Sequence, residues 1–203
     1  MLPTIKLQIT KLRSLRPLGW RNWGLSLSLC SSLWAGSVLP LNAVEINGTT
    51  QFVELPQLTY AAASNTDAYG RGSSFFFTIT VPDGATEALK RVTIQQTQGT
   101  DRRWYNSIYR LQAFEGTRRK PERELALETV GFDPEARALL IDFAPAIAPG
   151  TTVTIRIRPR RNPGPGGIYL FQVNGFPDGV NPISQYLGLG RFHFYDRRDR
   201  YWY

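Results

Sequence analysis

The stretch "TTVTIRIR", Thr151–Arg158, carries the clearest structural pattern in the chain. Its apolar residues alternate with threonine or arginine, so that Val153, Ile155 and Ile157 share one face of an extended segment. Side chains of a strand point alternately to its two faces, and β-branched residues suit a pleated surface. The stretch therefore predicts a strand with one face in a core and the other toward solvent.

The same period of two recurs along most of the chain after residue 44. The further runs of this type are "SFFFTITV" (Ser74–Val81), "RVTIQQT" (Arg91–Thr97), "ALLIDF" (Ala138–Phe143), "GIYLFQVNGF" (Gly167–Phe176) and "GRFHFYD" (Gly190–Asp196). Clusters of proline and glycine, such as "VPDG" (81–84) and "NPGPGG" (162–167), fall where these strands should end. The pattern predicts about eight to ten short strands, which is typical of an antiparallel sandwich or a Greek-key barrel.

Two segments do not share this period. "ATEALKR" (Ala85–Arg91) reads as a helix of about two turns, and Ala61–Ser74 reads as an exposed loop. The Pro149–Gly150 pair before Thr151 resembles the proline-glycine-led strand of bacterial immunoglobulin-like domains. We therefore predict an all-β protein whose single domain, residues 44–196, is an antiparallel immunoglobulin-like β-sandwich with one short helix.

Residues 1–43 are organised like a secretory signal. Basic residues up to Arg21 come first, the apolar stretch Leu25–Leu39 follows, and "PLNA" ends on the small residue Ala43. We expect this signal peptide to be cleaved. An uncleaved anchor is the alternative, because Leu25–Leu41 reaches the shortest length that spans a bilayer. Either outcome exports the domain to the periplasm or outer cell envelope, and the membrane is touched only through an uncleaved segment.

The overall charge overstates the basic character of the exported part. The formal net charge is +8, but five of the 24 basic residues precede Val44, which leaves 19 basic against 16 acidic residues, or +3. Export also argues against a nucleic acid partner. Cys30, the single cysteine, lies in the apolar segment, so the domain is expected to fold without a disulfide.

Several catalytic and cofactor chemistries lack the residues that they need. His193 is the single histidine, and with no cysteine after residue 43 a structural zinc site or a copper site cannot be assembled. No G-x-S-x-G motif accompanies His193, whose place between two phenylalanines fits a surface imidazole. We expect no cofactor and no enzyme activity. The alternative is a hydrolase that uses two carboxylates, for which the candidates are Glu54, Glu115, Asp142 and Asp196.

One group of basic residues lies in "EGTRRKPERE", Glu115–Glu124. Arg118 and Arg119 share this stretch with three glutamates, so their charges should be largely screened within the loop. Such mixed charge fits a hairpin tip with a purely structural role. Contact with a ligand or partner is the alternative, because loops often carry function.

A second group is the stronger candidate for binding an anion. Residues 151–167 contain Arg156, Arg158, Arg160 and Arg161 and no acidic residue. Arg156 and Arg158 should share a strand face at about 7 Å. Of the basic residues after position 43, 17 are arginine and 2 are lysine, a bias that suits contact with carboxylate, sulfate or phosphate. The alternative is that these arginines keep an edge strand soluble.

Aromatic residues stand beside arginines in two further places. Trp104 and Tyr105 lie in "RRWYNSIY" (Arg102–Tyr109), and the C-terminal tail, residues 197–203, ends in "RYWY". Aromatic rings stack on the faces of sugars. We expect Trp104 and Tyr105 to anchor a loop to the core, with contact to a partner as the alternative. The tail need not be ordered.

Several of these stretches together resemble one protein family. They are "FFFTITVPDGATEALKRVTIQQ", "AFEGTRR", "FAPAIAPGTTVTIRIRPRRNPGPGGIYLFQVNGFPDG" and "QYLGLGRFHFYD". Their order is similar to that in the exported cyanobacterial proteins classed as "domain of unknown function 2808". The resemblance covers roughly residues 44–196. It implies an exported protein of the cell envelope and brings no reaction, cofactor or catalytic residue with it.

These observations favour a non-catalytic binding or structural module. We expect its partner to be an anionic envelope polymer, such as an envelope polysaccharide, or another envelope protein. The alternative is the carboxylate-dependent hydrolase, with envelope polysaccharide as its substrate. The candidate binding residues are Arg156, Arg158, Arg160, Arg161, Arg118, Arg119, Trp104 and Tyr105.

Overall fold

The computed structural model describes residues 45–46, 48–102 and 104–196. The expected signal peptide, residues 1–43, and the tail, residues 197–203, lie outside the described residues. Within the described ranges, no helix combines the length and apolar character needed to cross a membrane.

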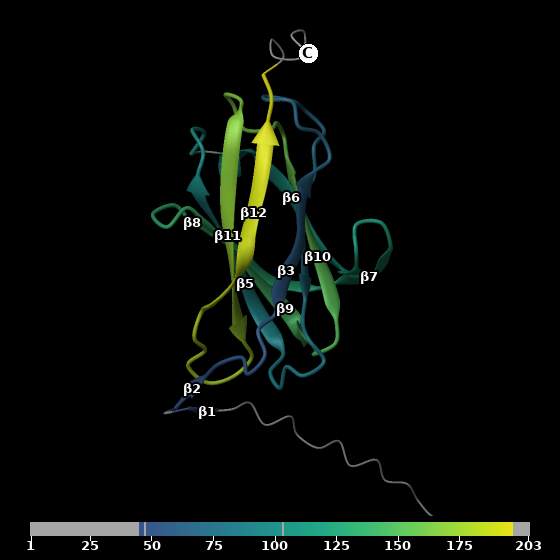
Figure 1. The fold of residues 1–203 in the computed structure, drawn as a ribbon, viewed down its shortest axis with the longest axis vertical. Coiled ribbons are helices and arrows are strands. Elements are labelled where there is room, and N and C mark those ends of the chain that lie inside the picture. The colour runs from purple at the N-terminus through teal and green to yellow at the C-terminus, as the bar shows by residue number, and fades with distance from the viewer. Residues whose placement is uncertain (1–44, 47, 103, 197–203) are drawn as a thin grey trace, which may run out of the picture. The chain divides into compact units, whose positions relative to one another are not determined.

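Ten strands form two antiparallel sheets of five strands each, as the sequence predicted (Figure 1). Sheet I has the order β3 (Gln57–Ala63), β4 (Phe75–Thr80), β10 (Thr152–Pro159), β6 (Ile108–Gly116) and β7 (Pro121–Leu125). Sheet II has the order β12 (Gln185–Phe194), β11 (Gly167–Pro177), β5 (Leu89–Gln98), β9 (Ala138–Ile147) and β8 (Leu127–Asp133). A small ladder of β1 (Glu45–Ile46) and β2 (Thr49–Thr50) precedes them. The chain is thus an all-β sandwich.

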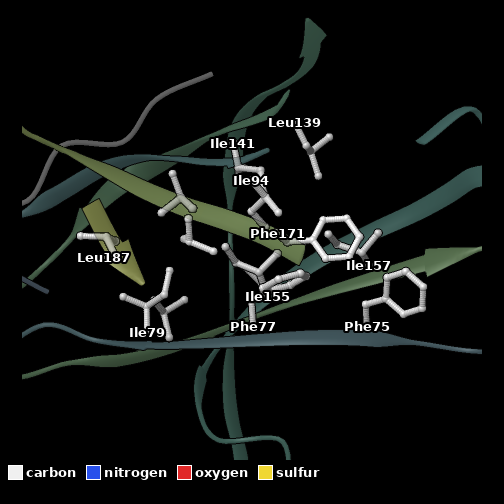
Figure 2. Packing of buried hydrophobic residues seen from close by; sticks show 14 of the residues in the cluster. Phe75, Phe77, Ile79, Ile94, Leu139, Ile141, Ile155, Ile157, Phe171 and Leu187 are labelled. Atoms are coloured by element: carbon white, nitrogen blue, oxygen red, sulfur yellow. The ribbon is translucent and has the colours of Figure 1, made fainter. Parts of the chain in front are cut away.

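The inward faces of the two sheets form one apolar core. Val153, Ile155 and Ile157 of β10 are fully buried, as their alternation predicted. Figure 2 shows Phe77 of sheet I beside Phe171 of sheet II, and their rings meet edge to face with centroids 6.0 Å apart. Each fully buried side chain of this size contributes about 1.5–3 kcal/mol relative to exposure. This shared core holds the outer faces of the sheets in fixed positions.

Strand β10 lies in the centre of sheet I. It pairs with β4 on one side, with Ile155 opposite Phe77, and with β6 on the other, with Arg156 opposite Gln112. The alternative that Arg156 and Arg158 protect an edge strand is therefore wrong. These two arginines point outward from the middle of a sheet, where neighbouring strands supply contacts on both sides.

The predicted short helix over Ala85–Arg91 is also wrong. Strand β5 begins at Leu89, and the described residues contain a single helical turn, the 3-10 segment Trp104–Ser107. Ala85 and Leu89 are both buried, a spacing of four that a helix would also produce. Glu87 between them is buried as well, and its carboxylate accepts a hydrogen bond from the Val53 backbone at 3.1 Å.

The segment Ala61–Ser74 is less exposed than predicted. Ala61 to Ala63 belong to β3, and the rest of the segment wraps around the buried side chain of Asn162. The Asn162 Nδ2 group donates hydrogen bonds at 2.8 Å to the carbonyl oxygens of Asn65 and Asp67. An asparagine almost a hundred positions away thus organises this loop.

One lateral side of the sandwich is closed by a close approach of strands β3 and β12. A Cβ atom added at Gly188 would lie 2.7 Å from the Cβ of Leu58, and one added at Gly190 would lie 3.0 Å from the Cβ of Ala61. The φ of Gly188 is +150°, which also favours glycine. The two glycines let the sheets meet along this seam without a shared hydrogen-bond ladder.

Candidate functional site

The hairpin tip between β6 and β7, residues 117–120, folds over the outer face of sheet I. Strand β6 ends at Gly116, whose φ of +85° lies in the left-handed region. The Gly116 carbonyl accepts a hydrogen bond from the Thr154 hydroxyl at 2.7 Å, and Thr154 also bonds to Thr78 at 2.9 Å. Thr78 and Thr154 are buried although both point away from the core. This turn at Gly116 therefore covers the middle of the sheet.

The tip brings the two predicted arginine groups together on one aromatic ring. The guanidinium carbon of Arg118 lies 4.8 Å from the ring centroid of Phe76, and that of Arg156 lies 5.5 Å from the same centroid. Arg118 also donates from Nη1 to the hydroxyl of Tyr60 on β3, at 3.3 Å. A cation over an aromatic face is attracted by the negative charge density of that face. We call Arg118, Phe76 and Arg156 the arginine–phenylalanine cluster.

Two of the three acidic residues of the hairpin are engaged with other cations. Glu115 pairs with Arg123 at 2.5 Å, and Glu122 pairs with Lys120 at 3.4 Å. Arg118, Arg119 and Arg156 form no ion pair with any described residue. The screening expected for Arg118 and Arg119 is thus not made by direct ion pairs.

The arginines of the cluster stand in an electropositive setting. Burial lowers the pKa of Arg156 below its ordinary value, and the positive charges of Arg158 and Arg110 lower it further. Arg156 remains a cation, and its Nε donates to the hydroxyl of Ser74 at 3.2 Å. A negatively charged group placed here would relieve this repulsion.

Two hollows open on the outer face, and Arg118 lines both of them. The hydroxyl hollow, of about 630 Å³, is lined by Thr59, Tyr60, Thr78, Thr117, Arg118 and Arg119. The mixed hollow, of about 370 Å³, is lined by Phe76, Gln112, Phe114, Arg118, Glu122, Glu124 and Arg156. Both volumes lie in the range of small-molecule sites.

The other predicted arginines lie apart from these hollows. Arg158 is half-buried opposite Arg110 of β6, and its Nε has no hydrogen-bond partner among the described residues. Arg160 and Arg161 are exposed beyond the end of β10, where Arg161 lies over the ring of Tyr69 at 5.9 Å. The four predicted arginines are thus divided: Arg156 belongs to the cluster, and the others lie apart from it.

The aromatic candidates lie near the 3-10 turn Trp104–Ser107. Tyr105 stacks on Phe132 of β8, with ring centroids 3.5 Å apart, and packs against the core. This placement agrees with the expectation that Tyr105 anchors a loop, and its contact with a partner stays a prediction. The side chain of Trp104 lies outside the described part of the structure, so the expectation for Trp104 stays a prediction.

Several residues that line the hollows were not predicted from the sequence, among them Phe76, Tyr60 and Gln112. Phe76 did carry a signal, because it places a large apolar ring on the otherwise hydroxyl-bearing face of "FFFTIT". Tyr60 and Gln112 carried none, since their positions depend on how β3 and β6 align with β4 and β10.

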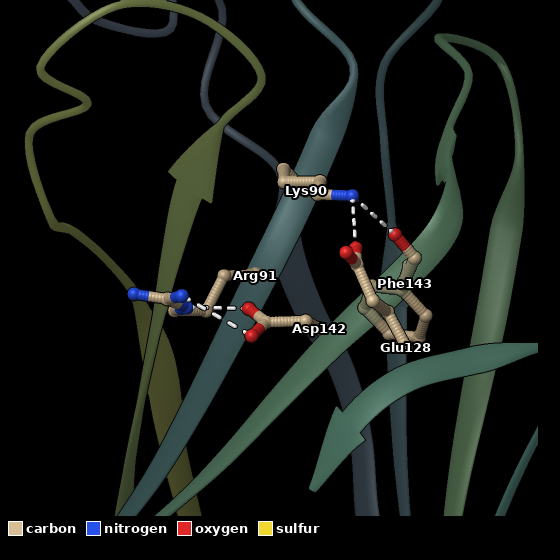
Figure 3. A network of polar contacts seen from close by, with 5 residues as sticks. All are labelled: Lys90, Arg91, Glu128, Asp142 and Phe143. Carbon is tan, nitrogen blue, oxygen red and sulfur yellow. Dashed lines mark hydrogen bonds and ion pairs between the residues drawn. The ribbon is translucent and has the colours of Figure 1, made fainter.

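Three of the four carboxylates of the hydrolase alternative are engaged in separate contacts, and the fourth, Glu54, is exposed. Asp142 of sheet II accepts two hydrogen bonds from Arg91, at 2.5 and 3.1 Å (Figure 3). Glu115 pairs with Arg123 of sheet I, and Asp196 accepts a hydrogen bond from the Gly166 backbone at 3.1 Å. His193 is exposed against the ring of Tyr195, in agreement with the surface interpretation. The described residues contain no group of three or more His, Cys, Asp or Glu side chains that could hold a metal ion.

The fold and this surface define the molecule as a β-sandwich domain with an arginine-rich outer face. Its sequence matches the family "Protein of unknown function (DUF2808)" over residues 49–194, and the chain belongs to that family. The resemblance noted from the sequence is thereby confirmed. No curated protein matches the chain.

Solved structures share only the general architecture with this chain. The collagen binding subdomain of the Enterococcus faecalis surface protein ACE is 10% identical, with 68% of this chain and 97% of that chain covered and a TM-score of 0.37. A collagen-binding domain from a Staphylococcus aureus adhesin is 7% identical, with coverages of 68% and 97% and a TM-score of 0.36. For the C-terminal domain of the Streptococcus pyogenes protein AspA, the identity is 11% and the TM-score 0.38, and 64% of this chain is covered. This chain spans less than half of that one, 42%. TM-scores this low carry no information about function.

Proposed function

We propose that the protein is an exported, non-catalytic binding module of the cell envelope that binds an anionic envelope polymer. The proposed site is the outer face of sheet I. The observation that carries it is the arginine–phenylalanine cluster, in which Arg118 and Arg156 share Phe76 and pair with no described acid.

The chemistry of this cluster suits an anionic ligand better than it suits stability. Two guanidinium groups near one another repel, and this repulsion offsets part of the attraction that each has to the Phe76 ring. Guanidinium groups form paired hydrogen bonds with carboxylate, sulfate and phosphate. A polymer with repeated anionic groups would therefore find matching partners on this face.

The other candidate functions receive less support. The hydrolase needs two carboxylates that converge on a substrate. Asp142 pairs with an arginine on sheet II and Glu115 pairs with an arginine on sheet I, so the two carboxylates lie on different sheets. Another envelope protein, bound through acidic side chains, could use the same cluster, and the binding experiment below separates it from a polymer.

The test is binding of the full chain, purified in mild detergent, to immobilised polygalacturonate as an anionic polysaccharide. We expect the affinity to fall as salt rises. Arg118→Glu should weaken binding about tenfold, the size of one lost charge-assisted contact. The control is Arg191→Glu, which reverses the exposed arginine of β12 on sheet II and should change the affinity little. Equal effects of the two variants would overturn the site, and no binding to the polymer would overturn the polymer as its ligand and favour an acidic envelope protein.

Export is tested separately. Because every charge of the first 43 residues precedes the apolar stretch, we expect the protein purified from the envelope to begin near Val44. N-terminal sequencing measures this directly. A full-length membrane-bound protein would select the anchor alternative, and a full-length protein in the cytosol would contradict export.

A further inference from the structure

The two hollows beside Arg118 differ in the charge that they accept. The hydroxyl hollow presents the guanidinium groups of Arg118 and Arg119, and among the described residues no carboxylate lines it. Its other lining groups are three threonines and the ring of Tyr60, which is 43% exposed. An anionic sugar unit fits this hollow, because the arginines meet its charge, the threonines meet its hydroxyls, and the tyrosine ring can stack on its face.

The mixed hollow has a different character on the other side of Arg118. The carboxylates of Glu122 and Glu124 line it together with the amide of Gln112, and their two negative charges balance the positive charges of Arg118 and Arg156. Gln112 Nε2 donates to Glu124 Oε1 at 2.8 Å, which holds that carboxylate at the wall. A second anionic unit would gain less here than in the hydroxyl hollow, because the glutamates offset the arginines, whereas a neutral sugar offers hydroxyl donors to the carboxylate oxygens. Phe114, also at this wall, adds an apolar ring.

We propose that the ligand is an acidic polysaccharide in which a neutral sugar unit adjoins each acidic one. The acidic unit occupies the hydroxyl hollow, the neutral unit occupies the mixed hollow, and the chain passes Arg118 between them. This assignment rests on the proposed function, because it names the polymer class that the same face binds.

The experiment compares two polymers that differ in this one respect. Hyaluronate alternates glucuronate with neutral N-acetylglucosamine, whereas every unit of polygalacturonate is acidic. We would measure the affinity of the full chain for oligomers of each, matched in length, by titration calorimetry. Charge density alone favours polygalacturonate, and the two hollows favour hyaluronate. We expect hyaluronate oligomers to bind about fivefold tighter, the upper size of an exposed charge effect.

A variant in the mixed hollow tests the cause of the preference. Glu124→Gln removes one repelling charge and keeps a hydrogen-bond acceptor, so it should strengthen polygalacturonate binding about two- to fivefold and reduce the preference for hyaluronate. The control Glu128→Gln changes an exposed glutamate of sheet II and should leave the preference unchanged.

The outcomes separate this inference from the proposed function. Equal affinities for the two polymers, tighter binding of polygalacturonate, or an unchanged preference in Glu124→Gln would overturn the inference and leave anion binding intact. Failure of both polymers to bind would overturn the proposed function and the inference together. Tyr60→Ala should weaken both polymers, because both place an acidic unit in the hydroxyl hollow, and undiminished binding would overturn that placement.

Discussion

The central strand of each sheet carries an outward-pointing arginine, but the two arginines have different surroundings. Arg91 of β5 lies 5.8 Å from the ring centroid of Phe176, and Arg156 of β10 lies 5.5 Å from that of Phe76. Asp142 pairs with Arg91 through two hydrogen bonds, whereas no described acid pairs with Arg156.

The pKa values of the two arginines move in opposite directions. The hydrogen bond that Arg91 donates to Asp142 raises the pKa of Arg91 above its ordinary value, so its charge is stabilised by the fold. Burial and like charges lower the pKa of Arg156. The arginine of sheet II is thus paired with an acid of the same sheet, whereas the arginine of sheet I has no described acidic partner and is available to an anionic ligand.

The largest effect should come from the turn that covers sheet I. In Gly116→Val, the new Cβ would lie 2.3 Å from the Lys120 carbonyl oxygen, and valine would have to adopt a φ of +85°. We expect a loss of about 3 kcal/mol in the free energy of unfolding, together with loss of polymer binding. Gly131→Val on sheet II is the matched control, because nothing lies within 4 Å of its added Cβ. Urea unfolding of both variants measures this, and similar losses would refute the role of the turn.

The second effect concerns the paired arginine. Asp142→Ala removes a nearly buried carboxylate that accepts two hydrogen bonds from Arg91, and it should cost about 2 kcal/mol. Glu115→Ala breaks the more exposed pair with Arg123 and should cost less than about 1 kcal/mol. Thermal unfolding measures both, and an equal cost would show that burial does not distinguish the two pairs.

The third prediction concerns the unpaired arginine. Arg156→Met removes a partly desolvated charge among other arginines and keeps an apolar stem over Phe76. We expect the free energy of unfolding to change by less than about 0.5 kcal/mol, with any change toward greater stability. Binding to polygalacturonate should fall all the same. A clear loss of stability would mean that Arg156 is a structural residue like Arg91.

The smallest effect should come from Lys90 on sheet II. Its hydrogen bond to Glu128 raises its pKa above the ordinary value of 10.5 (Figure 3). Because the folded-state pKa is raised, this contribution is fully present below pH 10.5 and is lost as the pH rises through the raised value. Urea unfolding between pH 9 and 12 should therefore show a slightly steeper loss for the wild type than for Lys90→Gln. Parallel curves would contradict the contribution.

The strands of the core could be predicted because their alternation is local. Val153, Ile155 and Ile157 follow the period of two without interruption, and all three are fully buried. The same reasoning failed at Ala85–Arg91, because Ala85 and Leu89 stand four apart and suit a helix as well as this loop and strand start. Glu87 is held in the observed loop by its hydrogen bond with the Val53 backbone. A contact between segments so far apart in the chain cannot be predicted from a local pattern.

The candidate site could be predicted only in its components. Arg118 and Arg156 could be selected from the sequence because both stand among other basic residues. Their two groups were predicted as alternative binding sites. Their meeting at Phe76 depends on the order β4–β10–β6 and on the turn at Gly116. Strand order is a long-range property, so neither the site nor the central place of β10 follows from spacing along the chain.

The glycine seam between β3 and β12 has a mechanical consequence. Leu58 meets Gly188 and Ala61 meets Gly190, so the two strands run in the same direction. The chain enters sheet I through β3 and leaves sheet II through β12, and tension between its ends would pull on opposite ends of this pair (Figure 1). The hydrogen bonds that join β3 to β4 and β12 to β11 lie across the pulling direction, so they would be loaded together in shear rather than one after another. The domain is therefore built to resist stretching along its strands, a property that would serve any module that holds a polymer under load.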